Sequence, residues 1–312
     1  MGKNVTLLAR TSKEANELIS TGENSRFLPG IQFPEPLKIT SRIEEVIPQA
    51  NIVLLAVPSA RLRENINSIA DLITRDTIVV IATKGLEHNT GKRMSEIVCE
   101  EIRHRENISV CSMSGPNLAN EIIMNKPSST VIACDHRSTS RKAQSILKTK
   151  NLRIYTNSDI IGVEISGAAK NTIAIAAGIS DGLALGNNAK ASLITRGLYE
   201  ITKLGTSLGA EINTFYGLAG IGDLIATCSS ALSRNNQVGR MLSQGMNIEE
   251  IKENMNNVAE GIDTTKALIK ISRHKNLEMP IAEAVHQVIL GHLGASEAVK
   301  TLMLRDSKSE VT

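Results

Sequence analysis

The sequence has 312 residues, which is enough for two domains that each bury a core. Hydrophobic residues make up 41% and charged residues 21%, as in an ordinary globular protein rather than a disordered or membrane chain. A net charge of +3, 2% aromatic residues and no tryptophan give no support for a nucleic-acid or anionic-membrane partner. We expect neither a membrane span nor a signal peptide. The four cysteines lack paired spacing, which argues against a metal or disulfide framework and predicts a reducing, cytoplasmic location.

The first half alternates strand-like and helix-like segments. Short β-branched runs, several of them apolar throughout, occur at residues 5–9, 52–57, 77–83, 108–113, 129–134 and 152–155. Helical spacing is found between them at residues 59–72, 91–103 and 137–148. Strands that are apolar throughout are typical of a sheet covered on both faces. The pattern therefore predicts an α/β, Rossmann-like domain with a mostly parallel sheet, whose ligands bind at the carboxyl ends of the strands.

Three of the predicted strands end in polar residues, namely Arg10, Ser59 as a helix cap and Lys84, and a polar turn follows a fourth. Arg10 follows the first strand, where dinucleotide folds hold an acid for a ribose hydroxyl or an arginine for a 2′-phosphate, so it favours NADP over NAD. Lys84 directly follows a buried strand, where substrate and nicotinamide are expected to meet. The turn from Ser114 to Glu121 contains Asn117, a helix cap whose neighbouring N–H groups can hold an anion. Taken alone, each is equally compatible with an ordinary solvated or capping residue.

One part of a dinucleotide-binding fold is not found in the sequence. Such a fold begins with a strand, a G-x-G-x-x-G turn and a helix whose N-terminus holds the pyrophosphate. The sequence instead runs from Met1 to Asn4 into what reads as the second strand, and no G-x-G-x-x-G follows a strand elsewhere. We therefore expect the domain to lack its first strand and helix. A misplaced start site is favoured over a true truncation as the reason, because the rest of the pattern is intact.

The second half is predicted to be helical. From about residue 158 the strand-like runs stop, and helical periodicity takes over at residues 190–208, 258–270, 280–290 and 295–304. We place the boundary there, with residues 1–157 as an N-terminally incomplete dinucleotide-binding domain and 158–312 as an all-α substrate-binding and catalytic domain. The first long helix of the second domain is expected to contain Gly162 to Gly178.

Lys170 is the single cation in that stretch of small and apolar residues. A desolvated lysine has a lowered pKa and can exchange a proton near neutral pH, as an acid/base residue must. Taken alone, such a lysine more often packs its stem and extends its ammonium to water.

Later segments place further polar groups after turns. The glycine-rich stretch from Gly217 delivers Asp223, and Ser233-Arg234-Asn235 offers an arginine for a phosphate with two flanking donors. Glu260 follows Val258 and Ala259, and without context a solvated glutamate is its simpler interpretation.

Taken together, these segments resemble the bacterial NAD(P)-dependent sn-glycerol-3-phosphate dehydrogenase family. The matching stretches are AVPS from Ala56, TKG from Thr83, SGPNLANE from Ser114, GVEISGAAKNTIAIAAGISDGLALGNNAKASLITRG from Gly162, GLAGIGDLIATC from Gly217, SRN from Ser233, AEG from Ala259 and MPI from Met279. They occur in order over most of the chain, so no single short motif carries the resemblance.

The resemblance implies an enzyme that reduces dihydroxyacetone phosphate to sn-glycerol 3-phosphate for phospholipid synthesis. It implies NADPH as cofactor, with NADH possible, a small-molecule substrate as partner and a possible homodimer. Lys170 would be the proton donor and acceptor. The implied substrate contacts are Lys84, Gly115, Asn117, Lys170, Asp223, Ser233, Arg234 and Asn235. The implied cofactor contacts are Arg10, Lys84, Ala119, Arg234, Val258 and Glu260. Asn117 stands where the family usually has serine or threonine.

Two alternatives remain at this point. A related β-hydroxyacid dehydrogenase would also place a lysine on an interdomain helix, although Ser233-Arg234-Asn235 and the turn to Asp223 favour a phosphorylated triose. A cofactor-incompetent remnant acting as a binding protein is suggested by the absent phosphate-binding turn, whose lost donors could cost several kcal/mol of cofactor affinity. The complete set of substrate-side polar residues argues against it.

Overall fold

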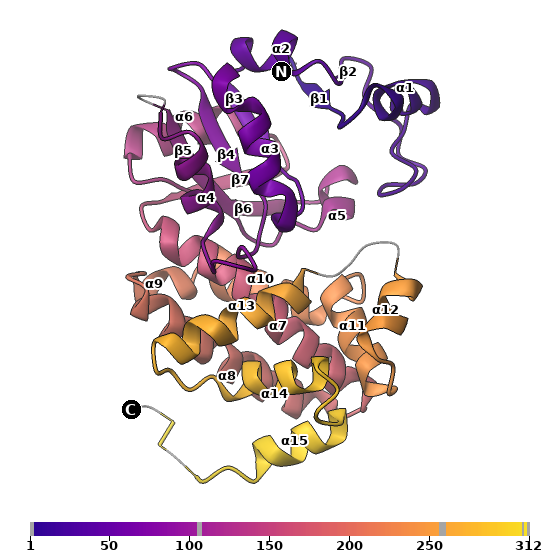
Figure 1. The fold of residues 1–312 in the computed structure, drawn as a ribbon, viewed down its shortest axis with the longest axis vertical. Helices are drawn as coiled ribbons and strands as arrows, with labels where there is room; N and C mark the ends of the chain where they lie inside the picture. The colour runs from indigo at the N-terminus through magenta and orange to yellow at the C-terminus, as the bar shows by residue number, and fades with distance from the viewer. Residues whose placement is uncertain (1–2, 105–107, 256–259, 308, 311–312) are drawn as a thin grey trace.

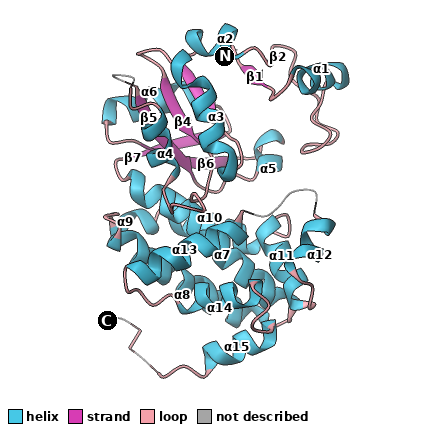
Figure 2. Cartoon of the chain, in the orientation of Figure 1, coloured by secondary structure: helices cyan, strands magenta, loops and turns pink. Residues whose placement is uncertain are grey.

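The structure is a computed structural model that describes residues 3–104, 108–255, 260–307 and 309–310. Figures 1 and 2 show a half built around a sheet, which contains the N-terminus, and a helical half, which contains the C-terminus. Among the described residues every strand ends at or before Asn157, and every element from Ile160 onward is helical. The predicted fold class, a mostly parallel Rossmann-like sheet followed by helices, is confirmed.

The sheet-containing half has two groups of strands. Its described strands are β1 Thr6–Leu8, β2 Lys38–Thr40, β3 Ile52–Leu55, β4 Ile78–Ile81, β5 Ser109–Ser114, β6 Ser128–Ala133 and β7 Leu152–Asn157. β3 to β7 form one sheet in sequence order, parallel except for the antiparallel β5–β6 pair. β1 and β2 form a separate parallel pair. Each of the six strand-like runs overlaps a strand, with ends that differ by one or two residues, whereas β2 is not predicted because its three residues form no apolar run.

Helices cover both faces of the larger sheet. The helices of this half are α1 Ser12–Thr21, α2 Ile43–Val46, α3 Leu62–Ile69, α4 Met94–Glu101, α5 Ala119–Ile123 and α6 Arg137–Leu147. α3 and α4 cover one face, where Leu62 and Ile97 share a buried cluster with Val79. α6 covers the other face, where Ala143 packs with Val80. Because both faces are covered, all four residues of β4 are buried.

No ladder among the described residues joins β1 and β2 to the larger sheet. A doubly wound sheet has the order 3-2-1-4-5-6, so its first strand lies between the second and the fourth. Here β1 and β2 pair with each other, and β3, β4 and β5 follow one another in the larger sheet. Among the described residues, the ladder along β3 is the one with β4, and Leu54 of β3 is 47% exposed. That a phosphate-binding strand and turn belong between these two groups of strands stays a prediction.

α7, residues Ile160–Gly182, is the central helix of the other half. Asp159 caps it, because its Oδ1 accepts from Gly162 N–H at 2.7 Å. Its small residues allow close packing, and an added Cβ on Gly178 would stand 2.0 Å from the carbonyl oxygen of Asn236 on α11. By length and composition α7 could cross a membrane, but 83% of its most apolar window is buried inside the protein. It therefore packs as a core helix.

The remaining helices surround α7. They are α8 Gly186–Ser207, α9 Ile212–Phe215, α10 Asp223–Ser229, α11 Arg234–Ser243, α12 Ile248–Asn254, α13 Gly261–His274, α14 Pro280–Ile289 and α15 Ala295–Met303, with a π-helical turn at Leu218–Gly222. Figure 1 shows α13 and α11 beside α7 and beneath the sheet. Each helical segment predicted for this half overlaps one of these helices, although residues 258 and 259 of the second lie outside the described residues.

Candidate active site

α7 carries Lys170 to the edge of the sheet where β4 and β5 end. The helix passes β5 at Gly167, where an added Cβ would stand 2.5 Å from Ser114 Oγ, so glycine permits the approach. One turn later Lys170 is only 7% exposed. Its Nζ donates to Asp223 Oδ1 at 2.7 Å and to Thr227 Oγ1 at 2.5 Å. The first turns of α10 therefore hold the ammonium of the predicted catalytic lysine.

Thr227 is a residue of this site that the sequence interpretation missed. It lies four residues after Asp223 on α10, so the two side chains project from one face of the helix. Its hydroxyl also donates to the backbone oxygen of Asp223 at 2.7 Å. The spacing of a hydroxyl four residues after a buried acid was the available signal.

Lys84 lies on the other side of the same carboxylate. Its Nζ donates to Asp223 Oδ2 at 2.7 Å and to the backbone oxygen of Gly115 at 2.9 Å. Lys84 follows β4, and the next residue, Gly85, has a φ of +146° and would clash with Ser59 if it carried a Cβ. The structure thus brings together Lys170, Lys84 and Asp223, which are up to 139 residues apart.

The charges around Lys170 prepare it for proton transfer. Burial, and then the positive charge of Lys84, lower the pKa of Lys170 to about 8, against the opposing effect of Asp223. A group with a pKa near the working pH is well matched to acid/base catalysis. Lys170 can therefore exist as ammonium or amine close to neutral pH.

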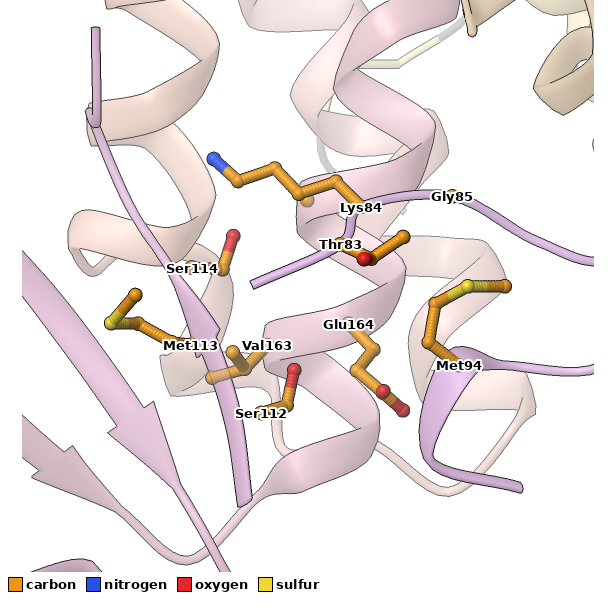
Figure 3. A pocket seen from close by; sticks show the side chains of 10 residues that line it. Thr83, Lys84, Gly85, Met94, Ser112, Met113, Ser114, Val163 and Glu164 are labelled. Atoms are coloured by element: carbon orange, nitrogen blue, oxygen red, sulfur yellow. The ribbon is translucent and has the colours of Figure 1, made fainter. Parts of the chain in front are cut away.

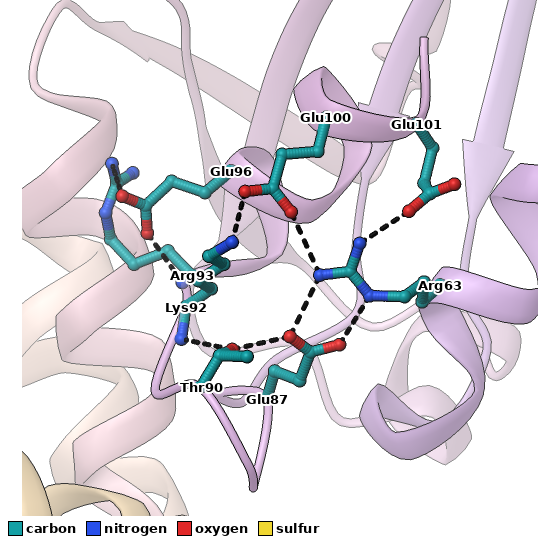
Figure 4. A network of polar contacts seen from close by, with 8 residues as sticks. All are labelled: Arg63, Glu87, Thr90, Lys92, Arg93, Glu96, Glu100 and Glu101. Atoms are coloured by element: carbon teal, nitrogen blue, oxygen red, sulfur yellow. Dashed lines mark hydrogen bonds and ion pairs between the residues drawn. The ribbon is translucent and has the colours of Figure 1, made fainter.

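An ion-pair network holds the loop that begins at Lys84 (Figure 4). Arg63 of α3 donates from Nε and Nη2 to Glu87 at 2.7 and 2.9 Å, and also pairs with Glu100 and Glu101 of α4. The hydrogen bonds to the Glu87 carboxylate raise the pKa of Arg63 above its ordinary value, and burial only partly opposes this effect. Lys92 at the end of the loop pairs with Glu100. The network ties both ends of the loop to the helices of the sheet-containing half.

The turn after β5 shows two unsatisfied polar atoms. Gly115 has a φ of +147°, and a Cβ there would stand 3.1 Å from the backbone of Thr130. Asn117 Nδ2 donates to Thr130 Oγ1 at 2.9 Å. Asn117 Oδ1 and Ser114 Oγ are buried without a partner. Buried polar atoms are nearly always paired, so these two are available to a ligand or water. Ala119 is exposed at the start of α5.

The Ser233-Arg234-Asn235 segment is placed largely by helix capping. Ser233 caps α11, because its Oγ accepts from Asn236 N–H at 3.3 Å. Asn235 Oδ1 accepts from Gly261 N–H at 3.0 Å, which ties α11 to the start of α13. Arg234 is exposed in the first turn of α11. The described contacts of Ser233 and Asn235 are therefore internal, and Arg234 is the member of the segment whose side chain faces solvent.

Glu260 links the two halves of the protein. Its Oε1 accepts from the backbone N–H of Ser59, in the turn after β3, at 3.3 Å. Burial raises its pKa, whereas the Ser59 hydrogen bond and the charge of Arg234 act in the opposite direction. Val258, the other expected cofactor contact in this segment, lies outside the described residues.

Arg10 lies away from the lysines, beside a second arginine that the sequence interpretation missed. β1 and β2 are parallel, so the residues after them meet at one edge, and Ser12 Oγ and Ser41 Oγ are 3.0 Å apart. Arg10 and Arg42 follow these two strand ends, with side chains 82% and 73% exposed. Arg42 was missed because β2 itself was not predicted. Two exposed guanidinium groups at one strand edge suit a phosphate.

A cavity of about 10 Å³ lies beneath Lys84 (Figure 3). Thr83 and Lys84 after β4, Ser112 and Ser114 of β5, and Glu164 of α7 contribute to its wall. This volume holds about one water molecule. A cavity of this size has no room for an organic ligand.

The fold and this site together define a class of protein. A doubly wound sheet whose strand ends face a buried lysine of lowered pKa on the following helix belongs to the two-domain dehydrogenases. Residues 1–140 match the NAD-dependent glycerol-3-phosphate dehydrogenase N-terminus, and residues 159–300 match the NAD-dependent glycerol-3-phosphate dehydrogenase C-terminus. The chain therefore belongs to the NAD-dependent glycerol-3-phosphate dehydrogenase family, as its motifs predicted.

Individual relatives support the same assignment. A glycerol-3-phosphate dehydrogenase [NAD(P)+] of Dehalococcoides mccartyi is 47% identical over 99% of this chain and 87% of the relative. One from Chlorobium limicola is 42% identical over 99% of this chain and 93% of the relative. The crystal structure of glycerol-3-phosphate dehydrogenase from Coxiella burnetii has a TM-score of 0.91 and 35% identity, covering 97% of this chain and 92% of that one.

Proposed function

We propose that the chain interconverts dihydroxyacetone phosphate and sn-glycerol 3-phosphate with NADPH, and less favourably with NADH. The observation that carries the proposal is the buried Lys170, whose pKa lies at about 8 beside Lys84 and Asp223. In this family setting the reduction supplies glycerol phosphate for phospholipid synthesis. We also propose that the enzyme is cytoplasmic and that it forms a homodimer. The boundary between its two domains is proposed to lie between residues 157 and 158.

Lys170 is the proposed acid and base. When the ketone is reduced, negative charge develops on its oxygen, and the Lys170 ammonium stabilises that charge and then donates its proton. In the reverse direction the neutral amine of Lys170 accepts the hydroxyl proton. Asp223 keeps the ammonium in place through a 2.7 Å hydrogen bond.

The other predicted substrate contacts are proposed to bind the phosphate and orient the triose. Lys84 and Arg234 add positive potential, which attracts a dianionic phosphate. The unpaired Oδ1 of Asn117 and Oγ of Ser114 are the buried polar atoms that a hydroxyl could satisfy. Ser233 and Asn235 contribute by fixing Arg234 between two helix starts.

The described residues fit two ends of a nicotinamide dinucleotide. Arg10 and Arg42 would hold the 2′-phosphate, which would compete with their exposed ion pairs to Glu14 at 3.8 Å and Glu45 at 2.8 Å. Lys84, Ala119 and Glu260 would lie at the nicotinamide end. When bound, the cofactor supplies the hydride. The backbone donors of a glycine-rich turn for the pyrophosphate are not found among the described residues.

Replacing Lys170 tests the proposal. Lys170→Met keeps an apolar stem in the buried position and removes the ammonium. We expect kcat for dihydroxyacetone phosphate reduction to fall about 100-fold or more, with an unchanged circular dichroism spectrum. Lys148→Met, at an exposed lysine after α6, is the matched control and should keep wild-type rates. A Lys170→Met variant within about twofold of wild type would show that Lys170 is not the acid.

A substrate comparison separates the proposed reaction from its neighbours. The purified chain should reduce dihydroxyacetone phosphate with NADPH and should not oxidise small 3-hydroxyacids at a comparable kcat/KM. Preference for a 3-hydroxyacid would favour a β-hydroxyacid dehydrogenase. Failure to bind NADPH or NADH in a fluorescence titration would favour a cofactor-incompetent binding protein.

A further inference from the structure

Cys111 of β5 lies opposite Cys134, the residue that follows β6, at the far end of the strand pair that leads to the candidate substrate site. The antiparallel register pairs Ser112 with Ala133, so one further step pairs Cys111 with Cys134. Directly opposed residues in antiparallel strands have Cα atoms about 4.5–5.5 Å apart, within the range of about 4.4–6.8 Å that disulfides span. Both side chains belong to the apolar cluster beneath α6. The backbone therefore already has the spacing of a disulfide.

The two thiols also interact unequally. The interaction between the two thiols favours the thiolate of Cys134 over that of Cys111, and the backbone N–H of His136 favours the same thiolate. His136 is the N-cap residue of α6, an 11-residue helix, and a helix N-terminus favours a nearby anion. Negative charge is consequently more stable on Cys134 than on Cys111.

The thiol pKa values agree with this geometry. The Cys111 hydrogen bond, and further the His136 N–H, lower the pKa of the Cys134 thiol to about 7, against burial and the charge of Asp135. The same thiol hydrogen bond, with burial, raises the pKa of Cys111. Cys99 lies at the surface, yet partial burial of its thiol raises the pKa of that group. Cys134 therefore has the stronger thiolate character, whereas Cys99 is the cysteine at the surface.

We propose that Cys111 and Cys134 form a redox-active dithiol that a peroxide oxidises to an intramolecular disulfide. The Cys134 thiolate attacks one peroxide oxygen and breaks the O–O bond, which yields a sulfenic acid at Cys134 and a hydroxide that takes up a proton to become water. The sulfur of Cys111 then attacks the sulfur of Cys134. The S–S bond forms, the S–O bond breaks, and a second water leaves with the proton of Cys111. The two thiols supply the two electrons that reduce the peroxide.

The location gives the peroxide a short route. Cys134 is 3% exposed, but Asp135 and His136, which follow it, lie at the surface. The small size of the oxidant suits such a buried pair. The same strand pair continues to Ser114 and Thr130, so the bond forms about three residues from the turn that carries Gly115 and Asn117.

Thiol mapping of the full chain tests this proposal. The reduced protein is treated with hydrogen peroxide at pH 7, unfolded in an alkylating reagent and digested for mass spectrometry. We expect the loss of two titratable thiols and one disulfide joining the peptides of Cys111 and Cys134, both reversed by dithiothreitol. Oxidation of Cys99 ahead of this pair, or peroxide consumption without a link between 111 and 134, would overturn the proposal.

Single variants assign the order of the two steps. Cys111→Ser should leave a sulfenic acid at Cys134 that a dimedone reagent traps, whereas Cys134→Ser should leave Cys111 reduced. Cys99→Ser is the control and should form the disulfide as wild type does. A sulfenic acid trapped at Cys111 in the Cys134→Ser variant would contradict the assigned order. If either buried variant fails to fold, disulfide mapping of the wild-type protein still tests whether Cys111 and Cys134 form the bond.

Discussion

Asp223 accepts a 2.7 Å hydrogen bond from Lys170, and both side chains are almost completely removed from water, at 2% and 9% exposure. The second oxygen of the same carboxylate accepts from Lys84 at 2.7 Å. One anion thus separates two cations, so the cluster keeps a net positive charge next to the strand ends. This charge balance, rather than burial alone, decides how readily Lys170 gives up its proton.

Asp223→Asn should shift the pH dependence of turnover. The Asp223 charge raises the pKa of Lys170, so its removal should move that pKa below its present value of about 8. Reduction needs the ammonium and therefore declines as pH rises through this pKa, whereas oxidation needs the amine and increases. The variant should show both limbs at lower pH, with kcat at neutral pH reduced by about tenfold or more. The measurement is kcat against pH in both directions.

Asp76→Asn, at an exposed aspartate before β4, is the control for this experiment. Its pH limbs should coincide with those of the wild type. An Asp223→Asn profile with unmoved limbs would mean that the titrating group is not Lys170.

The Lys170 helix could be predicted from sequence, and its partners in part. A long run of small and apolar residues with one lysine indicates a buried helix, and the motifs point to Asp223 and Lys84. The contacts themselves are not local: Lys170 and Asp223 are 53 residues apart, and which helix face meets which is decided by packing of the glycine-rich surfaces. Thr227 was missed because a threonine in a helix has many ordinary explanations.

Arg10→Ala should separate the two nicotinamide cofactors. Arg10 and Arg42 follow adjacent parallel strands, and each is held only by an exposed ion pair that a 2′-phosphate could replace. A charged hydrogen bond of this kind contributes about 1.5–3 kcal/mol, so we expect KM for NADPH to rise about tenfold or more. KM for NADH, which lacks the phosphate, should stay within about twofold. Steady-state kinetics with both cofactors provide the measurement.

Arg42→Ala should show the same selective effect, although Arg42 was found only in the structure. Arg141→Ala, an exposed arginine on α6, serves as control and should change neither KM. Equal increases in KM for NADPH and NADH would place the two arginines outside the phosphate site.

Glu164→Ala should destabilise the junction between the sheet and α7. Glu164 is buried, and it accepts from Ser95 N–H at 2.8 Å, from Ser95 Oγ at 2.6 Å and from Arg93 Nη1 at 2.8 Å. Removing Glu164 leaves the Ser95 donors without their partner and leaves Arg93 only the more exposed Glu96, which costs about 3 kcal/mol. The free energy of unfolding in urea is the measurement.

Glu96→Ala offers a matched comparison, because Glu96 pairs with the same Arg93. Its side chain is 46% exposed, and it also accepts from the Arg93 backbone N–H as part of the α4 cap. Loss of an exposed pair and a capping contact should cost only about 1 kcal/mol. Equal losses in the two variants would mean that burial does not distinguish the two carboxylates.

Several contacts that position the site carry little sequence signal. The motif predicts that Asn235 contacts the substrate, whereas in the structure its Oδ1 accepts a hydrogen bond from Gly261 N–H at the start of α13. Glu164 interrupts an apolar helix without indicating that its partner is the first turn of α4. Such side chains satisfy helix ends that are distant in the sequence, and only the assembled fold shows which end each one reaches.

Glu200→Gln should flatten the dependence of stability on pH. Glu200 is buried in α8 and accepts from the N–H groups of Ile281 at 2.7 Å and Ala282 at 3.2 Å in the first turn of α14. Burial raises its pKa from 4.5 to about 7, against the two hydrogen bonds. The folded state therefore binds a proton more tightly than the unfolded state, so this contribution is complete below about pH 4.5 and is lost as pH rises through about 7.

The pKa difference corresponds to about 3 kcal/mol of unfolding free energy across this range. Glutamine cannot ionise, so the variant should lose that slope whatever its absolute stability. Urea unfolding of wild type and Glu200→Gln at a series of pH values between 5 and 8 measures the slope, with the exposed Glu253→Gln as control. Parallel curves for wild type and Glu200→Gln would show that Glu200 ionises in the folded protein as it does in the unfolded chain.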